Sequence, residues 1–199
     1  MKSLKVRLAA LGFLEFAVWG SYLVSLGMYL GSAGLGDYVF WFYTVQGLVS
    51  LFMPGLIGVI ADRFIPAQKM MSLCHVLAGA FMVAAGWYAM SAGDDVHFGP
   101  LFTLYTLSVA FFMPTIGLNN SVAFSAMSKA GMDTVKEFPA IRCFGTVGFI
   151  CAELFVNFVA IDGQAIQFTY YQFFTCGIIS FILALYALTM PACDTNRDS

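Results

Sequence analysis

Long apolar runs separated by short polar breaks dominate the chain. The runs cover residues 8–30, 38–60, 70–90, 100–127, 139–160 and 168–190. Each is close to the roughly 20 residues that an α-helix needs to cross a bilayer. The breaks between them are rich in Gly, Asp and Lys, as turns and loops are. The pattern predicts an all-α membrane protein, with a bundle of six transmembrane helices over residues 1–190 and a linker or tail over 191–199.

The composition fits a bilayer environment. Of the 199 residues, 60% are hydrophobic and 10% are charged, against roughly 25% charged in soluble domains. The first apolar run follows Lys2, Lys5 and Arg7, as in a signal peptide, but it exceeds the roughly 7–15 residues of a signal-peptide core. We therefore expect a retained helix. No dense basic cluster indicates a nucleic-acid partner. The five cysteines and two histidines lack metal-site spacing, so we expect no metal and no cofactor.

The basic residues are divided unevenly among the breaks. The amino terminus, the second and fourth breaks with their edges, and the tail hold all nine of them: Lys2, Lys5, Arg7, Arg63, Lys69, Lys129, Lys136, Arg142 and Arg197. The first, third and fifth breaks hold none. The positive-inside rule therefore predicts that both termini are cytoplasmic.

Polar residues of the fifth run share one helical face. Arg142, Thr146, Phe149 and Glu153 follow one another at spacings that place them on a single stripe. A charge near mid-membrane is costly, so the stripe should face protein or a water-filled cavity. Arg142 is either a ligand-binding residue or a juxtamembrane positive-inside residue. Thr146 can instead bond back to its own helix, and Phe149 can serve only in packing.

Other polar residues lie inside the predicted helices. Glu15 and Glu153 are candidates for carrying a proton, because an intramembrane carboxylate indicates function by default. The alternative for both is a neutral side chain that is hydrogen-bonded between helices. Ser108, Thr115 and Asn119 form a second polar row, which we expect on the cavity side of the bundle. Further, weaker substrate-site candidates are Glu15, Trp19, Gln46 and Asn119, although interhelical hydrogen bonds would equally explain Gln46, Asn119 and His75.

Two motifs resemble those of transport proteins. Gly58, Asp62, Arg63 and Lys69 resemble the G-x-x-x-D-R/K-x-G-x-x-R/K motif of the major facilitator superfamily, although Ile65-Pro66 stands at its inner glycine. A second set of short motifs resembles the bacterial nucleoside:proton symporters of that superfamily: Gly131-Met132-Asp133, Phe138-Pro139, Ile141-Arg142 and Gly145-Thr146-Val147-Gly148-Phe149-Ile150, together with Trp19-Gly20-Ser21 and Phe52-Met53-Pro54.

This resemblance covers the chain but only half of the family's twelve-helix architecture. It implies proton-coupled nucleoside uptake across the bacterial inner membrane by alternating access, with this chain as the amino-terminal half. The implied partners are a nucleoside, a proton, the lipid bilayer and a second six-helix half, joined where residues 194–199 begin a linker. Arg142, Thr146 and Phe149 would lie at the substrate site. Asp62 and Arg63 would form a cytoplasmic latch between helices.

The sequence supports three other function classes to different degrees. An enzyme is not expected, because no GxSxG motif is present and His75 has no paired nucleophile. A membrane-embedded structural or assembly subunit without transport activity stays open, since polar stripes also hold helices together. A major facilitator half that carries another small polar solute stays open as well.

Overall fold

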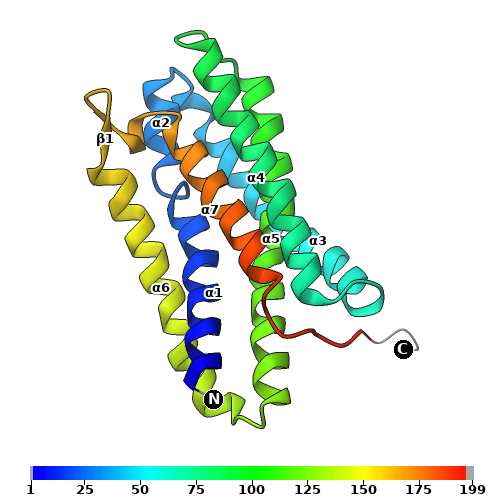
Figure 1. Ribbon diagram of the computed structural model, residues 1–199. Coiled ribbons are helices and arrows are strands. Elements are labelled where there is room, and N and C mark those ends of the chain that lie inside the picture. Colours follow the sequence, from blue (N-terminus) through cyan, green and yellow to red (C-terminus); the bar gives the residue numbers. More distant parts are fainter. Residues whose placement is uncertain (1, 196–199) are drawn as a thin grey trace.

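The computed structural model describes residues 2–195, and helices make up most of it (Figure 1). The helices are α1 (Lys2–Gly20), α2 (Leu26–Ser32), α3 (Val39–Arg63), α4 (Ala67–Ala92), α5 (Phe98–Lys129), α6 (Thr134–Phe158) and α7 (Tyr171–Ala187). Two 3-10 turns (Gly36–Tyr38 and Ile166–Phe168) and an antiparallel hairpin of β1 (Ala160–Ile161) and β2 (Gln164–Ala165) complete the described elements. The predicted helical class is confirmed.

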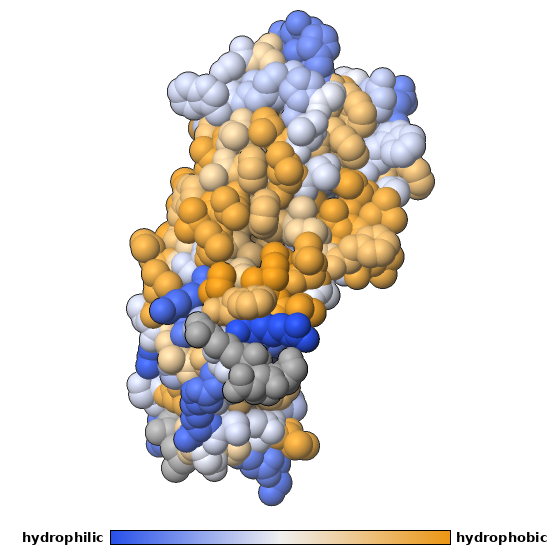
Figure 2. Space-filling view, turned by 90° about the vertical axis from the view of Figure 1, so that its right-hand side faces the viewer, coloured by the Kyte–Doolittle hydropathy of each residue, from blue (hydrophilic) through white to orange (hydrophobic). Residues whose placement is uncertain are grey.

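The long helices suit a membrane. Four segments are long and apolar enough to cross one, namely Gly36–Arg63, α4, α5 and α6, and α7 is apolar but shorter. Figure 2 shows a band of apolar surface between two ends that are rich in polar residues. The chain is therefore a multi-pass membrane protein.

The predicted first helix is broken. The run over residues 8–30 divides into α1 and α2 at the turn formed by residues 21–25. Within this turn, Ser21 Oγ donates to the Val18 carbonyl oxygen at 2.7 Å, and Ser25 Oγ lies 3.3 Å from the Ser21 carbonyl oxygen. Serine hydroxyls that bond to nearby carbonyls compete with regular helix. The prediction of one continuous helix was wrong because hydropathy does not register this competition.

The sixth helix, α6, begins earlier than its apolar run. Asp133 caps it by accepting hydrogen bonds from the backbone N–H groups of Val135 and Lys136, at 3.1 and 3.3 Å. Pro139, the first residue of the apolar run, therefore lies inside the helix. The helix also ends at Phe158, and the hairpin takes up residues expected in a simple loop.

The core forms where four helices meet. α1 lies between α6 and α7 (Figure 1), while α4 packs along both α5 and α7, and α3 lies against α5. Fully buried side chains from these helices include Leu11, Met71, Tyr105 and Phe173. By contrast, α3 and α6 leave a large apolar surface exposed, including Phe40, Leu51, Phe52, Phe144, Ile150 and Phe158.

Glycines set the distance between α1 and α6. A Cβ atom at Gly148 would collide with the backbone of Phe13, and one at Gly20 would collide with the backbone of Phe149. Small residues of this kind let membrane helices approach closely. The glycines of the Gly-Thr-Val-Gly motif therefore hold α6 close to α1.

The two ends of the bundle differ in charge. The amino terminus and the α5–α6 turn lie at the lower end of Figure 1, and the α3–α4 turn lies to the right and higher, where α4 begins. Lys5 pairs with Glu137 at the lower end, and Lys129 pairs with Asp194 at 2.9 Å. The loops at the opposite end carry acidic residues: Asp37, Asp94, Asp95 and Asp162. Arg197, which also entered the charge pattern, lies outside the described residues.

Candidate functional site

A row of aromatic rings joins α1 to α6 and carries a cation. The guanidinium carbon of Arg142 lies 4.0 Å from the centroid of the Phe16 ring. The Phe16 and Trp19 rings are 6.0 Å apart, and Trp19 meets Phe149 edge to face at 6.1 Å. Such contacts are favourable because the face of an aromatic ring is electron-rich. The structure thus brings together Arg142, Trp19 and Phe149. Phe16 was not predicted, although its place three residues before Trp19 puts both on one side of α1.

The stripe on α6 is open to its surroundings. Arg142, Phe149 and Glu153 are half-buried, and Thr146 is exposed. Within residues 2–195, Arg142, Thr146 and Glu153 form no hydrogen bond or ion pair through their side chains. Half-buried polar groups without protein partners are available to a ligand or to a second protein surface.

A cavity of about 430 Å³ opens beside the aromatic row. Side chains from α1, α3 and α5 line it: Trp19, Tyr43, Gln46, Gly47, Ser50, Pro54, Met113, Ile116 and Gly117. Its volume is in the range of small-molecule sites, which run from about 300 to 1,000 Å³. Trp19 Nε1 is buried and has no hydrogen-bond partner in the described part of the chain. Trp19 thus lines the cavity, and its indole N–H is a buried donor without a partner among the described residues.

Gln46 combines a structural and a lining position. Its Oε1 accepts hydrogen bonds from the hydroxyls of Tyr22 at 3.2 Å and Tyr105 at 2.7 Å. These bonds hold the amide of Gln46 between α3 and α5 while its side chain lines the cavity. Gln46 thus fits both of the interpretations that the sequence left open.

The polar row of α5 faces inward. Ser108 Oγ donates to the Ala78 carbonyl oxygen of α4 at 2.7 Å, and Thr115 Oγ1 lies 2.6 Å from Glu15 Oε1. Asn119 is also buried, with its Oδ1 unpartnered among the described residues. The prediction that this row faces the cavity was wrong for Ser108 and Thr115, because α4 and α1 supply their partners in the bundle interior.

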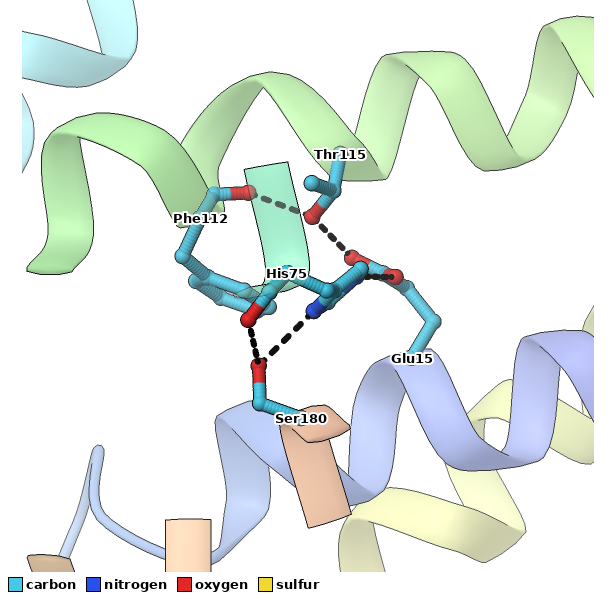
Figure 3. Close-up of polar contacts among 5 residues, drawn as sticks. All are labelled: Glu15, His75, Phe112, Thr115 and Ser180. Atoms are coloured by element: carbon cyan, nitrogen blue, oxygen red, sulfur yellow. Dashed lines mark hydrogen bonds and ion pairs between the residues drawn. The ribbon is translucent and has the colours of Figure 1, made fainter. Parts of the chain in front are cut away.

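Glu15 lies in the core and contacts three other helices through a polar network. It is fully buried, and its Oε2 lies 2.8 Å from Nε2 of the buried His75 on α4 (Figure 3). His75 Nδ1 lies 2.9 Å from Ser180 Oγ on α7. Glu15 does not line the cavity beside Trp19. Glu15 and His75 therefore fit the interhelical hydrogen-bond interpretation.

Asp62 and Arg63 lie at the end of α3 and are exposed. Neither takes part in an ion pair within the described residues. The latch suggested for them stays a prediction.

Known proteins resemble this chain along its whole length. The family described as Nucleoside H+ symporter matches residues 1–199. The xanthosine permease of Escherichia coli (strain K12) is 36% identical over 191 residues, which cover 95% of this chain and 43% of the permease. The nucleoside permease NupG of the same organism is 31% identical over 195 residues, with coverage of 95% and 43%.

Solved structures show the same likeness. The crystal structure of the nucleoside transporter NupG matches with a TM-score of 0.78 and 31% identity, over 94% of this chain and 44% of that one. A NupG variant gives a TM-score of 0.83 with 29% identity, over 98% and 46%. The chain thus spans less than half the length of the relatives it matches. With a family match over all of its residues, the chain belongs to the nucleoside H+ symporter family.

Proposed function

We propose that this chain forms the amino-terminal half of a proton-coupled nucleoside transporter of the bacterial inner membrane. In this proposal α1 with α2 makes the first of six membrane spans, and both termini are cytoplasmic. The basic end of the bundle, which holds the amino terminus, supports that orientation. One observation supports the substrate assignment: Arg142 and Phe149 of the open α6 stripe contact the α1 rings Phe16 and Trp19, and Trp19 lines the cavity.

The chemistry of the stripe suits a nucleoside. A nucleobase has a flat π-face that can stack on Phe149, as bases stack on aromatic side chains elsewhere. The Arg142 guanidinium has five N–H donors for base or sugar oxygens, and Thr146 can both donate and accept. Trp19 Nε1, which has no partner among residues 2–195, adds a donor from α1. Gln46 and Asn119 are weaker members of the proposed site.

Transport needs a second bundle. Alternating access works by rocking two bundles about a site between them. The relatives are more than twice as long as the matched segment, and a second six-helix half facing the α6 stripe would complete the site. We assign proton coupling to the intramembrane carboxylates Glu15 and Glu153. Asp62 and Arg63 would latch the cytoplasmic side during the transport cycle.

Substitution of Arg142 tests the substrate site. In the complete transporter, Arg142→Ala should weaken nucleoside binding at least about tenfold, because a charge-assisted hydrogen bond contributes roughly 1.5–3 kcal/mol. Arg142→Lys should restore binding only in part, since the planar fork is lost. Isothermal titration calorimetry on the purified proteins measures both.

The matched control is Arg7→Ala. Arg7 lies near the start of α1 and donates a hydrogen bond to the Thr189 carbonyl oxygen. Its substitution should therefore leave nucleoside affinity unchanged. If a folded Arg142→Ala protein binds nucleoside as tightly as the Arg7→Ala protein, then the charge of Arg142 only helps to orient the chain in the membrane. The substrate assignment then fails.

A further inference from the structure

In the network around Glu15, a buried carboxyl group meets a buried imidazole. Glu15 is the only buried carboxylate among residues 2–195, and no Lys or Arg is buried in that range. The network joins α1 through Glu15, α4 through His75, α5 through Thr115 and α7 through Ser180 (Figure 3). A carboxylate buried with an imidazole as its only ionisable contact is costly to ionise alone. The protons of this network therefore decide its energy.

On the carboxyl side, the contacts suit two protonation states. Thr115 Oγ1 lies 2.6 Å from Glu15 Oε1 and 2.5 Å from the Phe112 carbonyl oxygen, yet a hydroxyl carries only one proton. When Glu15 is ionised, Thr115 donates to the carboxylate. When Glu15 is protonated, its O–H donates to Thr115, and Thr115 donates to the Phe112 carbonyl. Binding a proton thus adds a hydrogen bond and breaks none.

The contacts of the His75 imidazole also suit two protonation states. Nε2–H of His75 donates to Glu15 Oε2, and Nδ1 of a neutral ring accepts from Ser180 Oγ at 2.9 Å. If Nδ1 is protonated too, it donates to Ser180, whose hydroxyl then reaches the His75 carbonyl oxygen at 3.3 Å. One added proton can therefore reside on either residue with every contact kept.

The surroundings favour one bound proton. The other titratable side chains buried among these helices are Tyr22 after α1, Cys74 on α4, Tyr105 on α5 and Cys176 on α7, all neutral in their ordinary states. The Phe112 ring lies edge-on to His75, with ring centroids 6.0 Å apart. With one added proton the pair is neutral overall, whereas without it an uncompensated negative charge remains in an apolar core.

We propose that Glu15 and His75 form a proton-binding site in the core of this bundle, whose ligand is a single proton shared between carboxyl and imidazole. Release of that proton leaves a negative charge that has hydrogen-bond donors but no cation beside it, and access to water would stabilise it further. The protonated site thus favours tight packing of α1 on α4, α5 and α7, and the empty site favours loosening of that contact.

Its place on α1 gives the site a connection to the substrate face. The ring of Phe16, the residue after Glu15, contacts the Arg142 guanidinium, and Trp19 lies one turn further along the helix. A shift of α1 against the core would therefore move both of these contacts. The statement that this site couples protons to transport rests on the proposed function. The statement that it binds a proton does not depend on that function.

Infrared difference spectroscopy tests proton binding directly. The complete transporter is reconstituted in lipid nanodiscs without nucleoside, and spectra are recorded through a pH titration. We expect a pH-dependent signal from a carboxyl C=O or an imidazole ring that disappears in Glu15→Gln, with about one proton fewer bound per chain. Glutamine reproduces the hydrogen bonds of protonated Glu15, so this variant should fold. The control Glu137→Gln alters a carboxylate at the charged end and should keep the signal.

A second pair of variants tests the role of the hydroxyl. Thr115→Val removes the hydroxyl that donates to Glu15 when Glu15 is ionised and accepts from it when Glu15 is protonated. The variant should therefore move the pH midpoint of the signal. Thr106→Val on the same helix removes a buried hydroxyl that has no partner in the described range, and it should leave the midpoint unchanged. Identical titration spectra for wild type and folded Glu15→Gln would overturn the proposal. Calorimetry on the same wild-type sample reports nucleoside binding separately, so failure of the proposed function is distinguishable from failure of the proton site.

Discussion

Polar groups on the two sides of α1 differ in whether they have hydrogen-bond partners. On the side facing α4, α5 and α7, the carboxyl oxygens of Glu15 and both ring nitrogens of His75 have partners within 3 Å. On the side facing α6 and the cavity, Arg142 and Trp19 Nε1 have no hydrogen-bond partner among the described residues. Glu15 and Phe16 are adjacent in sequence, yet they belong to these two different environments.

The difference separates structure from binding. A buried polar group without a partner costs about 1–3 kcal/mol, so unpaired groups persist where another molecule or domain supplies the partner. Around Glu15 and His75, the polar groups on the core side of α1 are therefore satisfied within this bundle, whereas Arg142 and Trp19 on the other side are available to a ligand or to a second bundle. Changes on the core side should first affect stability, and changes on the open side should first affect binding.

The largest effect is expected from removing the buried carboxyl. Glu15→Ala leaves His75 Nε2 and Thr115 without their partner and opens a cavity, so we expect a loss of about 3 kcal/mol or more in the free energy of unfolding. Glu153→Ala on the open face should cost less than about 0.5 kcal/mol. Chemical denaturation of both variants in the same detergent measures the difference. Equal losses would abolish the distinction between the two sides.

The parts of this arrangement that a single helix determines could be predicted from the sequence. The helical period alone places Arg142, Thr146 and Phe149 on one stripe, and all three lie in α6, while their shared role at a substrate site stays a prediction. The class of fold followed from hydropathy for the same reason. By contrast, the helix breaks depended on local hydrogen bonds: Ser21 interrupts the first run, and Asp133 starts α6 before the apolar pattern begins.

The core network could not be predicted in the same way. Glu15 and His75 lie 60 residues apart and meet only because α1 turns that face toward α4. The sequence supplied both residues but no spacing that links them, since periodicity within one helix carries no information about the facing helix. For the same reason, Thr115 was expected on the cavity side although its partner lies in the core.

A smaller effect is expected where α1 and α6 touch. Gly148→Ala places a methyl group against the backbone of Phe13, which cannot rotate away as a side chain could. Overpacking of this kind costs roughly 1–3 kcal/mol and should also displace Arg142 and Phe149 from α1, which weakens nucleoside binding. The comparison is Gly12→Ala on α1, where a Cβ would meet no atom within 4 Å. Gly12→Ala should be neutral or stabilising by up to about 1 kcal/mol. A Gly148→Ala protein as stable as Gly12→Ala would show that the close contact is dispensable.

The smallest effect is expected from the unpaired indole, and it isolates the open side most cleanly. Trp19→Phe keeps an aromatic ring between Phe16 and Phe149 and removes only the N–H that has no partner in residues 2–195, so no protein hydrogen bond is lost. Nucleoside affinity should fall about threefold to tenfold, since one neutral hydrogen bond is worth roughly 0.5–1.5 kcal/mol. Tyr105→Phe, which removes the donor at 2.7 Å from Gln46, should instead lower the free energy of unfolding by about 1 kcal/mol with little change in affinity. Calorimetric titration and denaturation of both proteins test the pair. If Trp19→Phe loses stability and keeps its nucleoside affinity, the Trp19 indole belongs to the packed core and not to the binding side of α1.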